Sequence, residues 1–262
     1  MRFPVRLSLA LAGARLARAW SPLHGAGRFQ FVDVAEILDA GATRPVCHQK
    51  LEEIPGARKP LIWMGGSEPL DHPGAGQLVR ALAQRARFVF VETSGCALRS
   101  RIHEFPPLPG IVFVARLESM RLESFLDARH PSASVLAQEG IRAARLSGFW
   151  TAAHLRVSAD TELAGIGEFA KRASGIELDG WLATAANPSA AALRKAEEAR
   201  RFVAHPLWRS FSEMIEPVLL RGTGGVSRPG VRIHEAAGQN AFKEQVLPLG
   251  TAPEGPQEGV LS

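Results

Sequence analysis

Polar side chains suited to chemistry stand at the ends of short apolar runs in this sequence. Three such ends carry Glu92 and Thr93, Arg116 and Glu118, and His154 and Arg156. Because side chains alternate along a strand, His154 and Arg156 point to the same side. The set is suited to contacting an anionic molecule or to non-redox chemistry. His154 also fits a hydrogen-bonded histidine of the core.

A glycine-rich turn provides a second candidate site. Residues 62–73 read IWMGGSEPLDHP, which indicates a strand, a turn and the start of a helix. Glycine has no Cβ, so the backbone carbonyls and amides of such a turn can approach a ligand closely. The candidate contacts are Gly66, Ser67, Glu68 and Pro69. A tight strand-to-helix turn without a ligand is the alternative interpretation.

Cysteine chemistry is limited by number, because the sequence has two cysteines, Cys47 and Cys96. Two thiolates cannot build an all-cysteine iron–sulfur site within one chain. They also argue against a disulfide framework and for a reduced, cytoplasmic setting. Cys96 is interpreted as a small buried hydrophobe. No zinc-ligand spacing, Walker loop or Ser/His/Asp order stands out.

The elements that must position these residues alternate between strand and helix. We expect strands at residues 29–37, 61–64, 88–92, 111–117, 152–157 and 178–184. Continuous apolar runs of this kind are typical of parallel strands covered on both faces. With helices between them, they form right-handed βαβ units. The predicted fold is α/β, a partial (βα)6 TIM-like barrel with parallel strands in sequential order, helices outside and the functional face at the carboxyl ends of the strands. An open doubly wound sheet is the competing geometry.

The helices are predicted from apolar residues spaced by three or four. The expected stripes are Leu78 and Leu82; Ala137, Ile141 and Ala144; Leu163, Ile166 and Ala170; and Leu207, Phe211, Met214 and Val218 in a last helix opened by Pro206. Asn187 and Pro188 form a helix-start signal, with the asparagine as N-cap and the proline in the first turn.

The two ends of the chain differ from its middle. Residues 1–28 hold an apolar stretch flanked by Arg2, Arg6, Arg15 and Arg18, which predicts a basic amphipathic helix over residues 5–19 and then a linker. Such a helix suits peripheral contact with a membrane. A secretory signal peptide is the alternative, but arginines interrupt its cleavage region. Residues 29–221 are assigned to the barrel, and residues 222–262, rich in Gly and Pro, to a poorly ordered tail.

Composition bounds the class of protein. The chain has 262 residues, 46% of them hydrophobic, and a formal charge of +5, which fits a globular protein with a basic surface. Such a surface can attract nucleic acid, anionic lipid or an anionic substrate. Arginines next to acidic residues, as in residues 194–201 (RKAEEARR), are more typical of solvated helix faces. Because no nucleic-acid motif or aromatic platform is present, we expect no nucleic-acid partner.

Several segments resemble the radical S-adenosylmethionine (SAM) superfamily, in the family's order. Residues 65–73 (GGSEPLDHP) resemble its "GGEPLLHP" segment, and residues 88–95 (FVFVETSG) resemble its third strand, which usually ends in "TNG". Residues 140–149 (GIRAARLSGF) are similar to "GIRALREAGF", and residues 178–181 (LDGW) to the "GVDGW" entry to the sixth strand. The resemblance spans roughly residues 1–220 and is closest to single-domain members that begin "MRFPLRL", including those that modify hopanoid lipids.

The resemblance implies a SAM pocket. In the family, the glycine-rich turn binds the SAM amino group through backbone oxygens, and polar residues at strand ends touch the ribose or carboxylate. Residue by residue, the implied contacts are Gly66, Ser67, Glu68, Pro69, Glu92, Thr93, His154 and Arg156. Ser67 stands where the family has a second glycine, so its side chain would crowd the ligand.

The family's cluster ligands are missing. Its members carry Cys-x3-Cys-x2-Cys after the first strand, and the triad holds a [4Fe–4S] cluster. At the same spacing this chain has Ala40, Arg44 and Cys47, so Cys47 is the remnant of the triad. Alanine cannot ligate iron, and arginine carries the wrong charge for a metal ligand.

We therefore expect a radical SAM-like pseudoenzyme with a binding, scaffolding or regulatory role, beside an active paralogue or another partner enzyme. No [4Fe–4S] cluster or other metal is expected, and SAM binding is expected to be weak at most. The alternative is a working enzyme. It would either borrow cluster ligands from another chain or use the same pocket for non-redox chemistry built on Glu68, Glu92, His154 and Arg156.

Overall fold

The structure, a computed structural model, describes residues 2–20, 29–33, 61–66, 68–118, 131–173 and 178–223. The chain divides into two units, Met1–Gly225 and Val226–Ser262. All of the described residues belong to the first unit. The expected poorly ordered tail lies outside them, except for residues 222 and 223, which end the last helix.

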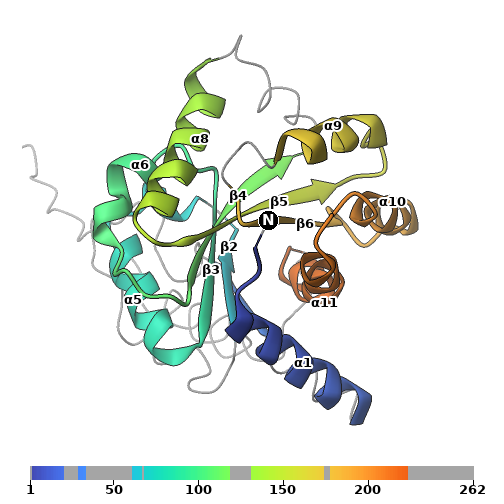
Figure 1. The fold of residues 1–262 in the computed structure, drawn as a ribbon, viewed down its shortest axis with the longest axis horizontal. Helices are drawn as coiled ribbons and strands as arrows, with labels where there is room; N and C mark the ends of the chain where they lie inside the picture. Colours follow the sequence, from blue (N-terminus) through green and yellow to red (C-terminus); the bar gives the residue numbers. More distant parts are fainter. Residues whose placement is uncertain are drawn as a thin grey trace, which may run out of the picture. The chain divides into compact units, whose positions relative to one another are not determined.

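Within these residues, six strands form one curled, all-parallel sheet. They are β1 (Phe29–Asp33), β2 (Leu61–Gly65), β3 (Phe88–Thr93), β4 (Ile111–Glu118), β5 (Trp150–Val157) and β6 (Gly180–Ala185). Each strand pairs in parallel with the next along the chain, in the order β1-β2-β3-β4-β5-β6. The sheet bends into a half-barrel (Figure 1). The predicted α/β partial barrel is confirmed, and no switch in strand order of the competing open sheet is present in the described part.

Helices flank the sheet. They are α1 (Val5–Trp20), α5 (Ala75–Arg85), α6 (Leu98–Arg101), α8 (Pro131–Leu146), α9 (Leu163–Ala173), α10 (Ala190–Arg200) and α11 (Pro206–Thr223). Two short 3-10 turns, η2 (Pro69–Asp71) and η3 (Ile102–Glu104), follow β2 and α6. Among the described helices, none has the length and apolar character needed to cross a membrane.

The convex face of the sheet packs against helices through large aromatic side chains. Phe113 on β4 meets Phe149, which lies between α8 and β5, edge to face, with ring centroids 5.1 Å apart. Trp181 on β6 meets Phe169 of α9 in the same way, at 5.4 Å. Such edge-to-face pairs add specific geometry to the burial of apolar area. The predicted stripes Leu78 with Leu82, and Ala137 with Ile141 and Ala144, are confirmed as fully or almost fully buried.

The concave face is filled by α11, whereas we expected all helices outside the barrel. Phe211 of α11 contacts Phe90 on β3, with centroids 5.0 Å apart, and Figure 1 shows the helix inside the bend of the sheet. The buried stripe is Trp208, Phe211, Ile215 and Leu219. The predicted stripe was Leu207, Phe211, Met214 and Val218. Only Phe211 of this stripe is fully buried; the other three are half-buried, and each buried residue is the next one along the chain, so the prediction was wrong by one position.

Helix α11 also provides hydrogen-bond acceptors for backbone amides at the free edge of β6, where a closed barrel would have another strand. The Ala183 amide donates to Ser212 Oγ at 3.2 Å, and the Ala185 amide donates to Glu216 Oε1 at 2.8 Å. Arg200 of α10 pairs with Glu216 and donates to the Ala183 carbonyl. An edge strand with unpaired amides invites aggregation, so these side chains stabilise the open form of the barrel.

Two local predictions have different outcomes. The N-terminal helix, expected over residues 5–19, is confirmed as α1. The predicted N-cap Asn187 was wrong, because Ser189 caps α10 by accepting from the Ala192 amide at 3.2 Å. Asn187 instead accepts from the Ser189 amide at 3.0 Å, which is a local turn immediately before the helix.

Candidate functional site

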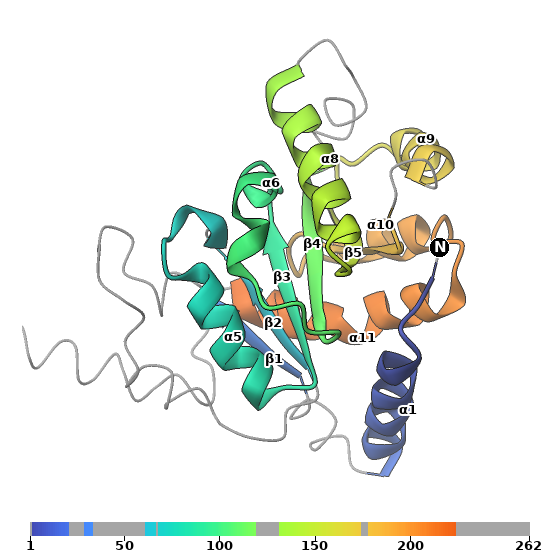
Figure 2. The ribbon, with the colours of Figure 1, turned by 60° about the vertical axis from the view of Figure 1, so that its left-hand side comes forward.

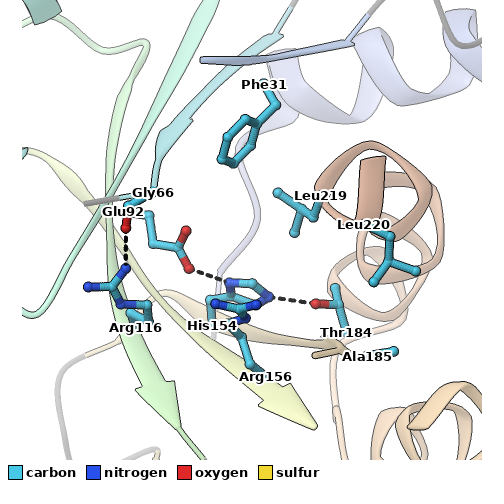
Figure 3. Close-up of a pocket in the computed structure, with 10 residues that line it drawn as sticks. All are labelled: Phe31, Gly66, Glu92, Arg116, His154, Arg156, Thr184, Ala185, Leu219 and Leu220. Carbon is cyan, nitrogen blue, oxygen red and sulfur yellow. Dashed lines mark hydrogen bonds and ion pairs between the residues drawn. The ribbon is translucent and has the colours of Figure 1, made fainter. Parts of the chain in front are cut away.

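A small pocket, partly open to solvent, lies at the carboxyl ends of the strands. Its polar side is formed by Glu92 on β3, Arg116 on β4, His154 and Arg156 on β5, and Thr184 on β6. Its apolar side is formed by Phe31 on β1 and by Leu219 and Leu220 on α11. Figure 3 shows the two sides facing each other. Parallel strands place their carboxyl ends at one edge of the barrel, which explains why residues so distant in sequence meet here.

A chain of hydrogen bonds crosses the polar side. Glu92 Oε1 lies 2.7 Å from His154 Nδ1, and His154 Nε2 lies 2.7 Å from Thr184 Oγ1 (Figure 3). All three residues are at most 5% exposed. Because a carboxylate only accepts, His154 Nδ1 donates to Glu92, and in the neutral imidazole Nε2 then accepts from the Thr184 hydroxyl. Both ring nitrogens are thus satisfied, as the core-histidine interpretation requires, while the residue still lines the pocket.

Glu92 is held in its charged form. Burial acts to raise the pKa of this carboxyl, but the His154 imidazole, the hydrogen bonds from His154 and Trp63, and the charge of Arg116 together bring the pKa below its ordinary value. Trp63 Nε1 donates to Glu92 Oε2 at 3.1 Å. The pocket therefore contains a fixed negative charge at its base.

Gly65, the last residue of β2, makes room for this carboxylate. A Cβ added to Gly65 would lie 2.7 Å from Glu92 Oε2, which is closer than carbon and oxygen atoms pack. Glycine is therefore needed here for contact within the protein, and this contact requires no bound ligand.

The carbonyl of the neighbouring Gly66 is already occupied. Arg116 Nη1 donates to the Gly66 oxygen at 2.7 Å (Figure 3). Gly66 has φ of 94°, a left-handed conformation that favours glycine. Arg156 Nη2 donates to the Ala186 carbonyl at 3.2 Å, so both guanidinium groups are anchored to backbone at the rim of the pocket.

Glu68 and Thr93 bind each other instead of lining the pocket. Thr93 Oγ1 donates to Glu68 Oε1 at 2.5 Å, and the Ser94 amide donates to Glu68 Oε2 at 2.6 Å. Glu68 also accepts from the Leu70 amide and caps η2, which begins at the buried Pro69. These contacts tie the turn after β2 to the end of β3, and they give Glu68 and Thr93 a structural role.

The predicted site residues thus fall into three sets, of which Glu68, Pro69 and Thr93, at the turn after β2 and the end of β3, are the first. The structure brings Gly66, Glu92, His154 and Arg156 together at the pocket. Ser67, and the residues Ala40, Arg44 and Cys47 that the resemblance aligns with the cysteine triad, lie outside the described residues. Within the described part, no group of three or more His, Cys, Asp or Glu side chains could hold a metal ion.

Sequence reasoning missed several residues of the site, namely Phe31, Thr184, Leu219 and Leu220. Thr184 could have been found, because it ends the sixth predicted strand and polar residues at such ends were the signal used elsewhere. Phe31 and the two leucines carry no local signal, because their role depends on α11 packing inside the bend of the sheet.

The fold and the pocket define an α/β half-barrel with a charged site at the carboxyl ends of its strands. The chain matches no family model and no curated protein. The chemistry of the pocket is therefore the basis for a function.

Proposed function

We propose that this protein is a radical SAM-like half-barrel that binds a small anionic ligand in its pocket without redox chemistry, as a binding or regulatory pseudoenzyme. The charge balance of the pocket supports this proposal. Arg116 and Arg156 contribute two positive charges, Glu92 contributes one negative charge, and no described carboxylate forms an ion pair with either arginine. A guanidinium has five N–H donors in a planar fork that suits carboxylates and phosphates.

The contact between Arg116 and Gly66 is the single observation that carries the proposal. In the family that the sequence resembles, the turn carbonyls receive the amino group of SAM. Here the guanidinium of Arg116 lies 2.7 Å from the Gly66 oxygen. A ligand ammonium would have to displace it and would then meet a second positive charge. The same arginine favours an anion in place of a cation.

The residues also do not suit the family's cluster. With two cysteines in the whole sequence, the chain cannot supply three thiolates. We therefore derive no step through iron or through SAM bound to iron.

The apolar side of the pocket indicates the chemical character of the part of the ligand that the arginines do not bind. Phe31 and Leu219 are at most 9% exposed and lie across from the arginines (Figure 3). Ligand pockets typically combine an apolar lining with a few polar groups that fix orientation. The ligand class that fits is a molecule with one carboxylate or phosphate head and an apolar body.

Calorimetric titration with octanoate tests the proposal. We expect binding to the wild-type protein, and at least about tenfold weaker binding to Arg156→Gln, because a charge-assisted hydrogen bond contributes about 1.5–3 kcal/mol. Arg194→Gln, at an exposed position on α10, is the matched control and should bind as the wild type does. If the wild-type protein does not bind octanoate, or if Arg156→Gln binds it equally well, the proposed anion site is refuted.

A second candidate, non-redox hydrolysis, is favoured by the relay from Glu92 through His154 to Thr184. Both of its hydrogen bonds are 2.7 Å long. In this reaction Thr184 Oγ1 attacks an acyl carbon while His154 Nε2 takes the hydroxyl proton and passes it to the departing alcohol. Water then cleaves the acyl–Thr184 bond by the same proton transfers.

The relay is tested by hydrolysis of a 4-nitrophenyl ester. Thr184→Val preserves the shape of the side chain and removes the nucleophile. Hydrolysis by the wild type that is lost in Thr184→Val would support the enzyme. Equal rates for the two proteins would exclude the hydrolase. Such a result would leave the anion-binding proposal standing, because octanoate binding is measured separately.

A further inference from the structure

Helix α1 has two apolar faces, and the fold uses one of them. Leu7 and Leu11, spaced by four, are at most 3% exposed and belong to the core, as does Phe3 just before the helix. Val5, Leu9 and Leu16 are 76%, 66% and 64% exposed. With 3.6 residues per turn, spacings of four and seven place these three residues on a single face, opposite the buried one.

The start of α1 is fixed at the end of the sheet opposite the pocket. The Arg2 amide donates to the Asp179 carbonyl at 2.6 Å, and the Arg2 side chain pairs with the Asp179 carboxylate at 2.7 Å. Trp208 Nε1 donates to the Arg2 carbonyl at 2.8 Å. Asp179 directly precedes β6, so these contacts lie at the amino ends of the strands. Figure 2 shows α1 extending away from the sheet at this end, so a partner on its outer face would leave the pocket mouth uncovered.

The charge of α1 selects the partner. The helix sequence contains Arg6, Arg15 and Arg18 and no aspartate or glutamate. Two copies of α1 brought together would add their positive charges, with no carboxylate on either helix to offset them. An anionic bilayer surface satisfies both properties of the helix, because apolar side chains enter the acyl boundary while the positive charge of the helix is attracted to lipid phosphates.

We propose that α1 is an in-plane membrane anchor, with Val5, Leu9 and Leu16 entering the surface of a bilayer that contains anionic lipids. The buried face holds the helix to the barrel at the same time, so docking requires no unfolding. The inference is independent of the ligand in the pocket.

Vesicle flotation with the full chain tests this proposal. The vesicles are phosphatidylcholine with and without phosphatidylglycerol. We expect the wild type to float with phosphatidylglycerol vesicles, to bind less to phosphatidylcholine alone, and to be released by salt. In the Leu9→Asp/Leu16→Asp double variant, binding should fall at least about tenfold, because each leucine loses its transfer into an apolar phase. Leu146→Asp, a 77% exposed leucine on α8, is the matched control and should bind like the wild type.

Three results would overturn the anchor. The wild type could fail to bind phosphatidylglycerol vesicles, or Leu146→Asp could lose binding to the same extent as the double variant. Sedimentation equilibrium without lipid could instead reveal a dimer that the double variant abolishes, which would make a second copy the occupant. Circular dichroism of each variant establishes that folding is intact, and Arg6→Glu gives an independent variant whose binding should also fall.

Discussion

The buried carboxylate of Glu92 gives the sharpest single-residue test of the polar network. It accepts from Trp63 Nε1 and His154 Nδ1 and lies in the field of Arg116. In Glu92→Gln, the side-chain amide offers one accepting oxygen and one donating NH2 group. If the oxygen keeps the bond from Trp63, the NH2 group faces His154 Nδ1, which must then accept. We therefore expect the imidazole proton to move to Nε2 and donate to Thr184.

The loss of stability in Glu92→Gln follows from the two hydrogen bonds whose partner is no longer charged. Hydrogen bonds to charged groups contribute about 1.5–3 kcal/mol, and neutral ones contribute about 0.5–1.5 kcal/mol. Two bonds become neutral, so we expect the free energy of unfolding to fall by about 2 kcal/mol at pH 7. The exposed Glu139→Gln, which removes a surface pair with Arg99, should change little.

The same prediction has a defined pH dependence. Because the pKa of Glu92 is lowered in the folded state, the ionised carboxylate stabilises the fold above the ordinary carboxyl pKa of about 4.3. This stability is lost as pH falls through the lowered value. Denaturant unfolding of wild type and Glu92→Gln should therefore converge in acid, and the nitrogen shifts of His154 should report the tautomer. Equal stability at pH 7, or a difference that persists unchanged in acid, would refute the reasoning.

Two further predictions concern the fold that carries the site. In Gly180→Ala, the new Cβ would clash with the indole of Trp208, so thermal unfolding should reveal a loss of about 1–3 kcal/mol from overpacking. Gly165→Ala, whose new Cβ meets nothing within 4 Å, should leave stability equal or higher, and an equal loss in both variants would contradict this. In Glu216→Ala, Arg200 loses its buried ion-pair partner and the Ala185 amide of β6 loses its acceptor. Denaturant unfolding should therefore reveal a fall of about 3–5 kcal/mol in the free energy of unfolding. Wild-type stability in this variant would contradict the role of α11 at the edge of β6.

Much of the sheet could be predicted from the sequence. Runs such as Phe88–Val91 and Ile111–Val114 are buried on both faces, and their apolar character is independent of distant contacts. Strands separated by helical patterns can then pair only in a few topologies. The polar strand ends Glu92, His154 and Arg156 were found for the same reason.

The remainder depends on tertiary packing, which a local pattern does not encode. The apolar residues of α11 fit a stripe at Leu207 or at Trp208, and packing inside the bend of the sheet, which buries Trp208, Ile215 and Leu219, selects the second. The family resemblance pointed to Gly66 as a ligand contact, but it did not indicate that Arg116, fifty residues later, would bind its carbonyl. Asn187 and Ser189 are both good caps, and local geometry chooses the serine.

The most direct test of the central claim is calorimetric titration of the wild-type protein with SAM, under conditions in which octanoate binds. The loss of two charge-assisted contacts, at about 1.5–3 kcal/mol each, weakens SAM by roughly 10²- to 10⁴-fold relative to a cluster-anchored site. The position of Arg116 at the Gly66 carbonyl opposes the SAM ammonium further. We predict no binding heat at about millimolar SAM. Binding at micromolar or lower concentration that a bulky substitution at Gly66 abolishes would contradict the anionic site and favour a SAM-dependent enzyme.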